Sequence, residues 1–273
     1  ITASIPDPWM YEDDRCLKPF RVSQVEDPHV FRFTRVQSLE QPEGELKAII
    51  PGVRVYGGGE RSVRYMGSVD ECWENAYIRA EFGGKNHSVQ VKTGENITQI
   101  GVKTVLNALC AEHLVAQNDG FVFHCAYIAH NGAAILFTAP SGTGKSTQAE
   151  LWRKHRDAEI INGDRAAVRV KDGLPVADGI PFSGSSAYCE NCTLPLAAIV
   201  YLSQAPRTTI RKLRPIEAFS KIWEGVSVNA WEKEDVERVS AAVQKIATEI
   251  PAFHLACTPD ETAVAALEEA LRK

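Results

Sequence analysis

The sequence predicts a mixed α/β protein of the α+β type, with a small β-rich region ahead of a larger mixed region. Residues 1 to about 90 alternate polar and apolar side chains in short runs between glycines, which is typical of antiparallel strands. Beyond them, apolar residues recur at helical spacing, and short β-branched runs then alternate with further helical segments. The 273 residues, 44% of them hydrophobic, suffice for two regions, which we place at 1–95 and 96–273.

The charge balance excludes some classes of partner. The formal net charge of -5 argues against nucleic acid, or an anionic membrane, as the main partner. No apolar run reaches the roughly 18 residues that a membrane-spanning helix needs, and no signal peptide is visible. We therefore expect a cytoplasmic protein.

Seven cysteines in a chain of this length do not make a disulfide framework. Cys189 and Cys192 form a C-x-x-C pair within a polar stretch of Ser, Gly and Asn. A zinc site or a redox pair is one interpretation, but neither a second such pair nor a histidine pair accompanies it. Reduced cysteines in a loop are the favoured interpretation.

In the first region, alternation predicts strands at residues 30–34, 47–50 and 76–80, with turns at 57–59 and 83–84. A helix is expected over 101–117, ending at Asn118-Asp119-Gly120 because glycine commonly follows a helix C-terminus. Two strands, 121–130 and 133–138, should then form a hairpin through Asn131-Gly132, since both residue types tolerate positive φ.

The remaining elements follow from the same patterns. We expect a helix at 145–155, a strand at 158–162, a hairpin of 166–170 with 174–177, and a buried strand at 196–202. Helices should occupy 216–223 and 233–248, and a strand 253–257. The last helix should begin with Thr258 as N-cap, Pro259 at its first position and Glu261 completing a capping box.

The stretch TAPSGTGKST, from Thr138 to Thr147, resembles a phosphate-binding loop between a strand and a helix. In such loops glycines turn backbone N–H groups inward, and the positive end of the following helix adds to the attraction for phosphate. Ala139 stands where the pattern has its first glycine, at the strand exit, where positive φ is not required. The alternative is a glycine-rich turn with an incidental lysine.

Under the phosphate-loop interpretation, Lys145 would reach the β- and γ-phosphates of ATP, and Ser146 would place its hydroxyl on Mg²⁺. The predicted nucleotide-binding set is Ser141, Gly142, Thr143, Gly144, Lys145, Ser146 and Thr147. Asp164, after the strand 158–162, is a candidate metal ligand or proton acceptor. Its alternative is a turn residue within Asn162-Gly163-Asp164. His124 is a weaker catalytic candidate, because a lone strand histidine usually has a structural role.

Taken together, His124 in FHCAYIAHNGAAILFTAPSGTGKST and Asp164 in IINGDR resemble the HPr kinase/phosphorylase family, and more closely HPr-kinase-related proteins found near peptide-modification systems. The resemblance covers about residues 120–273, including the segment GIPFSGSS at 179–186. It implies a phosphoenolpyruvate-carboxykinase-like nucleotide-binding core. Because HPr kinases assemble into oligomers, it also allows a homo-oligomer.

The resemblance assigns roles residue by residue. Lys145 becomes a phosphate ligand, Ser146 and Asp164 metal ligands, and His124 the histidine near the transferred phosphate. The family pattern has two adjacent aspartates, but Gly163 replaces the first here, so either Asp164 acts in turn as metal ligand and as base, helped by His124, or activity is reduced. Arg165 could neutralise charge on the transferring phosphoryl group. No counterpart of the C-terminal loop that engages HPr is visible, so HPr itself is not the expected substrate.

The predicted function is therefore an ATP- and Mg²⁺-dependent kinase that transfers the γ-phosphate to a hydroxyl, expected to be Ser on a peptide or small protein. A non-catalytic nucleotide-binding regulatory module is the alternative, favoured by the missing aspartate. Phosphoenolpyruvate carboxykinase activity itself is disfavoured, because the chain is short for that architecture. A basic run, Arg207, Arg211, Lys212 and Arg214, is either a solvated face or a contact for an acidic peptide or the nucleotide phosphates.

Overall fold

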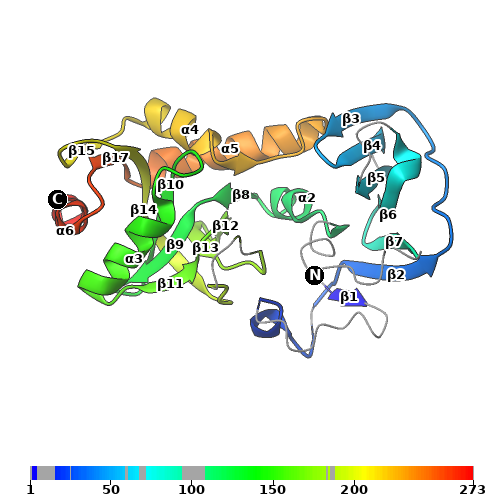
Figure 1. Cartoon of the computed structure of the whole chain (residues 1–273), viewed down its shortest axis with the longest axis horizontal. Coiled ribbons are helices and arrows are strands. Elements are labelled where there is room, and N and C mark those ends of the chain that lie inside the picture. The colour runs from blue at the N-terminus through cyan, green and yellow to red at the C-terminus, as the bar shows by residue number, and fades with distance from the viewer. Residues whose placement is uncertain are drawn as a thin grey trace. The chain divides into compact units, whose positions relative to one another are not determined.

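The computed structural model describes residues 2–4, 16–24, 26–58, 61–67, 72–93, 108–182, 184 and 188–272. The chain divides into two compact units, one of Ile1–Leu17 with Arg21–Cys110 and the other of Lys18–Phe20 with Ala111–Lys273. Both contain a β-sheet, and helices longer than one turn are described in the second (Figure 1). The predicted mixed α/β class is confirmed.

The first unit is built on a seven-stranded sheet with the strand order β1-β2-β7-β6-β5-β4-β3. Strand β2 runs parallel to β1 and β7, and the other neighbours are antiparallel. The strands are β1 (Thr2–Ser4), β2 (Val30–Val36), β3 (Leu46–Ile50), β4 (Val53–Gly58), β5 (Arg61–Gly67), β6 (Ala76–Phe82) and β7 (Asn86–Lys92), with a short 3-10 helix η2 (Trp73–Asn75) before β6.

Alternating side chains give this sheet a buried face. Phe31, Ile78 and Val89 are fully buried and share one face by register, as a period of two residues along each strand requires. The predicted strands 30–34, 47–50 and 76–80 correspond to β2, β3 and β6. Strands β4, β5 and β7 were not predicted, and Gly57 and Gly58 end β4 where a turn was expected.

The second unit contains a ten-stranded mixed sheet. Eight strands follow the order β11-β9-β10-β14-β13-β12-β8-β16, while β17 pairs with β14 and β15 with β17. The strands are β8 (Gly120–His124), β9 (Ala126–His130), β10 (Ala133–Thr138), β11 (Glu159–Asn162), β12 (Arg165–Lys171), β13 (Leu174–Asp178), β14 (Thr193–Gln204), β15 (Thr209–Lys212), β16 (Val226–Ser227) and β17 (Ala252–Cys257).

Strand β14 joins the two halves of this sheet. Its first residues pair antiparallel with β13, and its later residues pair parallel with β10 on one side and β17 on the other. The carboxyl ends of β10, β14 and β17 therefore meet at one edge. In open α/β sheets, that edge is where ligands commonly bind.

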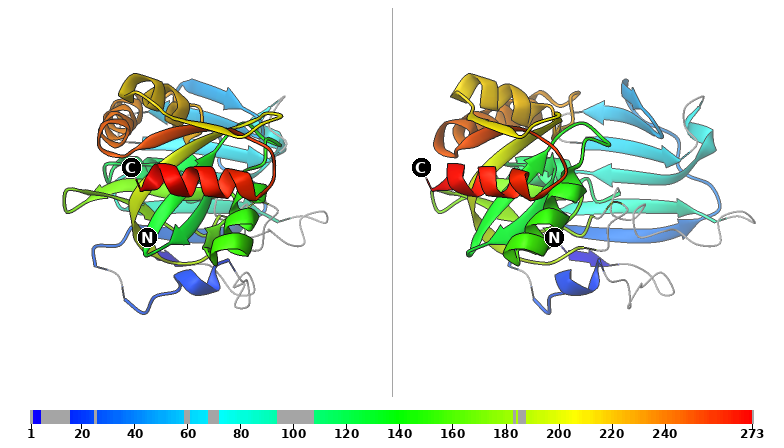
Figure 2. Two further views of the ribbon diagram at one scale, coloured as in Figure 1. Left: turned by 90° about the vertical axis from the view of Figure 1, so that its left-hand side faces the viewer. Right: turned by 60° about the vertical axis from the view of Figure 1, so that its left-hand side comes forward.

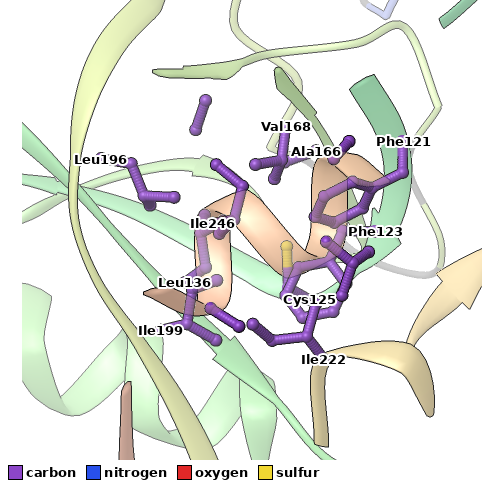
Figure 3. Close-up of a cluster of buried hydrophobic side chains, with 14 of the residues drawn as sticks. Phe121, Phe123, Cys125, Leu136, Ala166, Val168, Leu196, Ile199, Ile222 and Ile246 are labelled. Atoms are coloured by element: carbon purple, nitrogen blue, oxygen red, sulfur yellow. The ribbon is translucent and has the colours of Figure 1, made fainter. Parts of the chain in front are cut away.

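Helices cover both faces of the sheet. Helices α3 (Lys145–Arg156) and α6 (Glu261–Leu271) lie over one face (Figure 2), where the fully buried Trp152 packs with Phe137 and Leu267. Helices α4 (Pro215–Trp223) and α5 (Lys233–Glu249) cover the other, with the short α2 (Ala111–Ala116) beside β8. Figure 3 shows Ile222 of α4 and Ile246 of α5 in the buried cluster there, with Phe123 and Leu136.

Two predicted elements differ in the structure. The strand expected over 121–130 is two strands, β8 and β9, because the chain changes pairing partners at Cys125: β8 pairs with β12 and β16, whereas β9 pairs with β10 and β11. The backbone N–H of Cys125 instead donates to the carbonyl of Asp164, at 3.0 Å. Of the helix expected over 101–117, residues 101–107 lie outside the described residues, and α2 begins after Cys110, whose φ is +49°.

The predicted cap of the last helix is wrong. Asp260, not Thr258, is the N-cap of α6, and its Oδ1 accepts hydrogen bonds from the backbone N–H of Thr262 at 2.9 Å and from the Thr262 hydroxyl at 2.5 Å. Thr258 and Asp260 are both N-cap signals, and aspartate is as good an N-cap as threonine or better. The helix begins after the later of the two, Asp260.

Candidate functional site

The loop from Ala139 to Gly144, here called the glycine loop, connects the end of β10 to the start of α3. Gly142 has a φ of +77° and Gly144, the N-cap residue, a φ of +118°, both in the region that L side chains rarely adopt. Ala139 is not among the residues with positive φ, and its methyl group is buried in the cluster beneath α3. An alanine is therefore accommodated at that position, as the sequence suggested.

Lys145 lies folded against the glycine loop. It is 8% exposed, and its Nζ donates to the carbonyl of Ala139 at 2.9 Å and to that of Pro140 at 3.5 Å. Burial lowers the pKa of Lys145, and the Asp164 carboxylate opposes that shift. No side chain caps the N-terminus of α3, so its first backbone N–H groups keep their capacity to bind an anion.

A turn at the end of β11 presents Asp164. The Oδ1 of the fully buried Asn162 accepts from the backbone N–H groups of Asp164 and Arg165, at 2.9 and 3.0 Å. Asn162 Nδ2 donates to the carbonyls of Ile180 and Phe182, at 3.1 and 2.8 Å. Because Asn162 makes the hydrogen bonds of the turn, the Asp164 carboxylate is not needed for them and is available to neighbouring side chains.

His124, the last residue of β8, lies beside this carboxylate. Its Nε2 is 3.6 Å from Asp164 Oδ1, and 40% of its side chain is exposed. Burial lowers the pKa of His124, the charges of Lys145 and Arg165 act in the same direction, and Asp164 opposes them. These effects favour the neutral imidazole, which is the form that can accept a proton.

Arg165 completes the group. In register it pairs with His124 across β12 and β8, and its Nε is 3.2 Å from Asp164 Oδ2. Its guanidinium carbon lies 6.0 Å from the ring centre of Phe182. The structure thus brings His124, Asp164, Arg165 and Lys145 into one neighbourhood from separate places along the chain.

The remaining predicted nucleotide-binding residues surround this neighbourhood. Ser146 and Thr147 are exposed in the first turn of α3, Ser141 is exposed in the glycine loop, and Thr143 is partly exposed. Of the segment GIPFSGSS at 179–186, residues 183, 185 and 186 lie outside the described residues. A Cβ atom on Gly184 would meet Asp164 Oδ1 at 2.8 Å, so that backbone lies directly against the carboxylate.

Asn162 is the residue that the sequence analysis missed as a positioning group. Its position at the end of a β-branched run and before Gly-Asp was available as a signal, because asparagine commonly accepts from backbone N–H groups two residues on. Nothing local indicates that its amide would also hold the carbonyls of residues 180 and 182, since that contact depends on the fold.

The two cysteines of the C-x-x-C pair have different neighbours. Cys189 Sγ donates to the carbonyl of Ile180 at 3.3 Å, and Cys192 Sγ lies 3.6 Å from the hydroxyl of Tyr127. Neither is in a disulfide. Across the described part of the chain, no three His, Cys, Asp or Glu side chains are grouped to hold a metal ion. These neighbours fit two reduced structural cysteines.

A cavity of about 770 Å³ lies at the other end of the strands, near the amino ends of β10 and β17, where Ala133, Trp152 and Phe253 line it. Large pockets are the usual first choice for a ligand site. We favour the glycine loop instead, because converging backbone N–H groups on a glycine-rich turn are a typical binding site for phosphates, and the cavity lies away from that turn. No helix in the described ranges is long and apolar enough to cross a membrane.

Fold and site together define a mixed α/β protein in which a lysine, a carboxylate, a histidine and an arginine converge beside a glycine loop. The chain belongs to the family described as SynChlorMet cassette protein ScmC, whose model matches residues 89–271. A search of the curated proteins gives no match.

Among solved structures, the Hpr(Ser) kinase/phosphatase from Coxiella burnetii is similar, with 10% sequence identity and a TM-score of 0.33. The similarity covers 55% of this chain and 88% of that one. A similarity this low does not establish a shared fold, so the carboxykinase-like core remains a prediction from the sequence.

Proposed function

We propose that the protein is an ATP-dependent kinase with a phosphoenolpyruvate-carboxykinase-like core, which transfers the γ-phosphate to a hydroxyl, expected to be Ser on a peptide or small protein. The observation that carries the proposal is the convergence of Lys145, Asp164, His124 and Arg165 beside a loop with two glycines at positive φ. Each of these residues supplies a function that phosphoryl transfer needs.

The roles follow from position and charge. Lys145 would leave the carbonyl of Ala139 and pair with the phosphates, while the N–H groups at the start of α3 hold them. Asp164 would accept the proton of the acceptor hydroxyl. The hydroxyl oxygen would bond to the γ-phosphorus as the bond between that phosphorus and the β–γ bridging oxygen breaks, with ADP as the leaving group. The neutral His124 is placed to assist Asp164, and Arg165 would stabilise charge on the transferring group.

The side chains present are compatible with a magnesium ion. Mg²⁺ is typically bound by one or two carboxylate or hydroxyl oxygens, with phosphate oxygens and water completing its shell. Ser146 and Asp164 would supply such a pair, and both are accessible to solvent. When bound, the ion would neutralise charge on the phosphates.

The test is transfer of labelled γ-phosphate from ATP, with Mg²⁺, to a pool of Ser/Thr peptides and small metabolites. Lys145→Ala and Asp164→Asn should each reduce transfer by about 10²-fold or more, because each removes a group that contacts the reacting atoms. Matched controls are Lys154→Ala, on the same helix, and Asp172→Asn, in the β12–β13 turn, which should retain activity. Undiminished transfer by Lys145→Ala would refute the assignment.

The alternative is a nucleotide-binding module that regulates a partner without catalysis. It is favoured by one observation: Gly163 stands where the resembling kinases have a first aspartate, so Asp164 alone would have to act as both metal ligand and base. Under this alternative, ATP would raise the melting temperature of the wild type and not of Lys145→Ala, while no acceptor became labelled.

A further inference from the structure

A second, smaller pocket lies on the sheet face covered by α4, between that helix and strands β15 and β17; it is called the α4 pocket below. Its volume is about 300 Å³, and the residues that line it include Arg211, Leu213, Ile216, Lys221 and His254. None of these belongs to the candidate site described above. The α4 pocket is therefore a separate feature that needs its own explanation.

The α4 pocket lies level with the end of β10, from which the glycine loop starts. In register, Thr138 pairs with Tyr201 of β14, and Tyr201 pairs with His254 of β17. The Thr138 hydroxyl donates to the carbonyl of His124 at 3.1 Å, and the rings of Tyr201 and His254 lie 5.7 Å apart on the same face. Two strand spacings separate Thr138 from His254, which is roughly 10 Å.

Two cations, Arg211 and Lys221, and one carboxylate, Glu217, line the α4 pocket. The surrounding segment is basic in a chain of negative net charge, since residues 207–221 contain five Arg and Lys residues and Glu217 as the one carboxylate. Glu217 is shared between Arg211, at 3.3 Å, and Arg214, at 3.2 Å, so one anion faces two cations. The Lys221 ammonium lies 4.3 Å from the ring centre of Tyr201, at the side of the pocket nearest β14. It also pairs with Glu224 at 2.8 Å, a contact exposed to solvent.

An apolar contact lies among these charges. Ile216 is 72% exposed, the largest exposed fraction among the exposed large apolar side chains of the described residues, and Leu213 below it is buried. Exposed apolar groups rimmed by charge are typical of sites that bind another protein chain. The phosphates of a bound nucleotide would not need an isoleucine, and the net charge of the chain disfavours nucleic acid.

We propose that the α4 pocket docks the acceptor substrate, an acidic peptide segment with an apolar side chain seated against Ile216 and Leu213 and carboxylates beside Arg211 and Lys221. An extended peptide advances about 3.3 Å per residue, so an acceptor serine about three residues from the docked side chain would reach the end of β10. There it would meet Asp164 and His124. This inference rests on the proposed kinase function and adds the chemistry of the acceptor.

The test measures binding separately from transfer. The probe is a short fluorescent peptide with a serine, and with a leucine between two aspartates about three residues away; binding is followed by fluorescence anisotropy. The wild type and Lys145→Ala should bind it equally. Lys221→Gln should weaken binding about fivefold and Ile216→Asp about tenfold. Lys154→Glu, an exposed charge change on the opposite face of the sheet, should bind as the wild type does.

A second peptide, with lysines in place of both aspartates, should bind the wild type at least about fivefold more weakly than the first. Equal binding of the two peptides, or unchanged binding by both Lys221→Gln and Ile216→Asp, would overturn the docking proposal. If the acidic peptide binds as expected but the wild type never labels its serine, the docking site stands and the kinase function fails. Ile216 is exposed and not part of the core, so loss of folding would not account for its effect.

Discussion

At the scale of single residues, the candidate site depends on one buried amide. Asn162 is fully buried, and both its oxygen and its nitrogen are hydrogen-bonded to backbone groups. The turn contains Asp164, and these bonds attach it to the neighbouring segment at residues 180 and 182. A buried polar side chain with all its partners present is rigid, and losing it leaves several backbone groups without partners.

Asn162→Leu, which keeps the approximate size of the side chain, should therefore lower the free energy of unfolding by about 3 kcal/mol. Urea denaturation measures this cost. Phosphate transfer by the folded fraction should fall as well, because Asp164 loses the turn that positions it. Asn191→Leu is the control, since Asn191 is exposed and its side chain donates a single hydrogen bond, to the Pro19 carbonyl at 3.0 Å. An equal cost in the two variants would contradict the role given to Asn162.

His124 should make stability depend on pH. Burial lowers its pKa in the folded state below the ordinary value of 6.5, so between these two values the unfolded chain binds more protons than the folded one. The stabilising effect of this difference is fully present above pH 6.5 and is lost as pH falls through the lowered pKa. Urea midpoints measured above and below pH 6.5 should therefore fall less on acidification in His124→Gln than in the wild type. An identical fall in both would show that His124 is not held neutral.

At the scale of elements, the glycine loop can be compared with a second turn whose glycine has nearly the same φ. Gly142 has a φ of +77° and Gly132, in the β9–β10 hairpin, a φ of +76°, and a Cβ atom on either would meet no atom within 4 Å. Alanine at either position should cost about 1 kcal/mol of stability through backbone strain alone.

The two substitutions should differ in ATP binding. Gly142→Ala alters the loop whose N–H groups would hold the phosphates and should raise the ATP dissociation constant by about tenfold, whereas Gly132→Ala should leave it unchanged. Isothermal titration calorimetry with MgATP measures both. Equal affinities in the two variants would indicate that the glycine loop does not contact the nucleotide.

The elements also show which features sequence patterns can predict. Local signals were sufficient for α3, α4 and α5 and for the hairpin between β9 and β10, because caps, turns and helical spacing are encoded within a few residues. Pairing partners are not local. The change of partners at Cys125 divides an uninterrupted apolar run into β8 and β9, and the short strands β15 and β16 form only because β17 and β8 are there to pair with them.

At the scale of the whole molecule, the same distinction separates the predicted parts of the candidate site from the rest. Lys145 and Asp164 were identified from their spacing in the sequence. Lys145 begins the helix after the glycine loop, and Asp164 follows the next strand, so the succession of strand, loop, helix and strand places both near the glycine loop. The proximity of His124 to Asp164, and of the α4 pocket to the end of β10, depends on the order of strands in the sheet. That order results from packing of helices on both faces and is not contained in any one segment.

The region that carries this site should fold without the rest of the chain. The buried clusters on the two faces of the second sheet draw only on residues from Ala116 onward, and every residue of the candidate site lies in the same unit. A chain shortened to residues 96–273 should therefore fold and bind MgATP. At a ligand concentration one hundred times the dissociation constant, binding should add about 2.7 kcal/mol to its free energy of unfolding, as in the full chain. Lys145→Ala in the shortened chain should abolish that gain. A shortened chain that folds but gains nothing from MgATP would mean that nucleotide binding needs residues 1–95, which would contradict the two-region organisation proposed from the sequence.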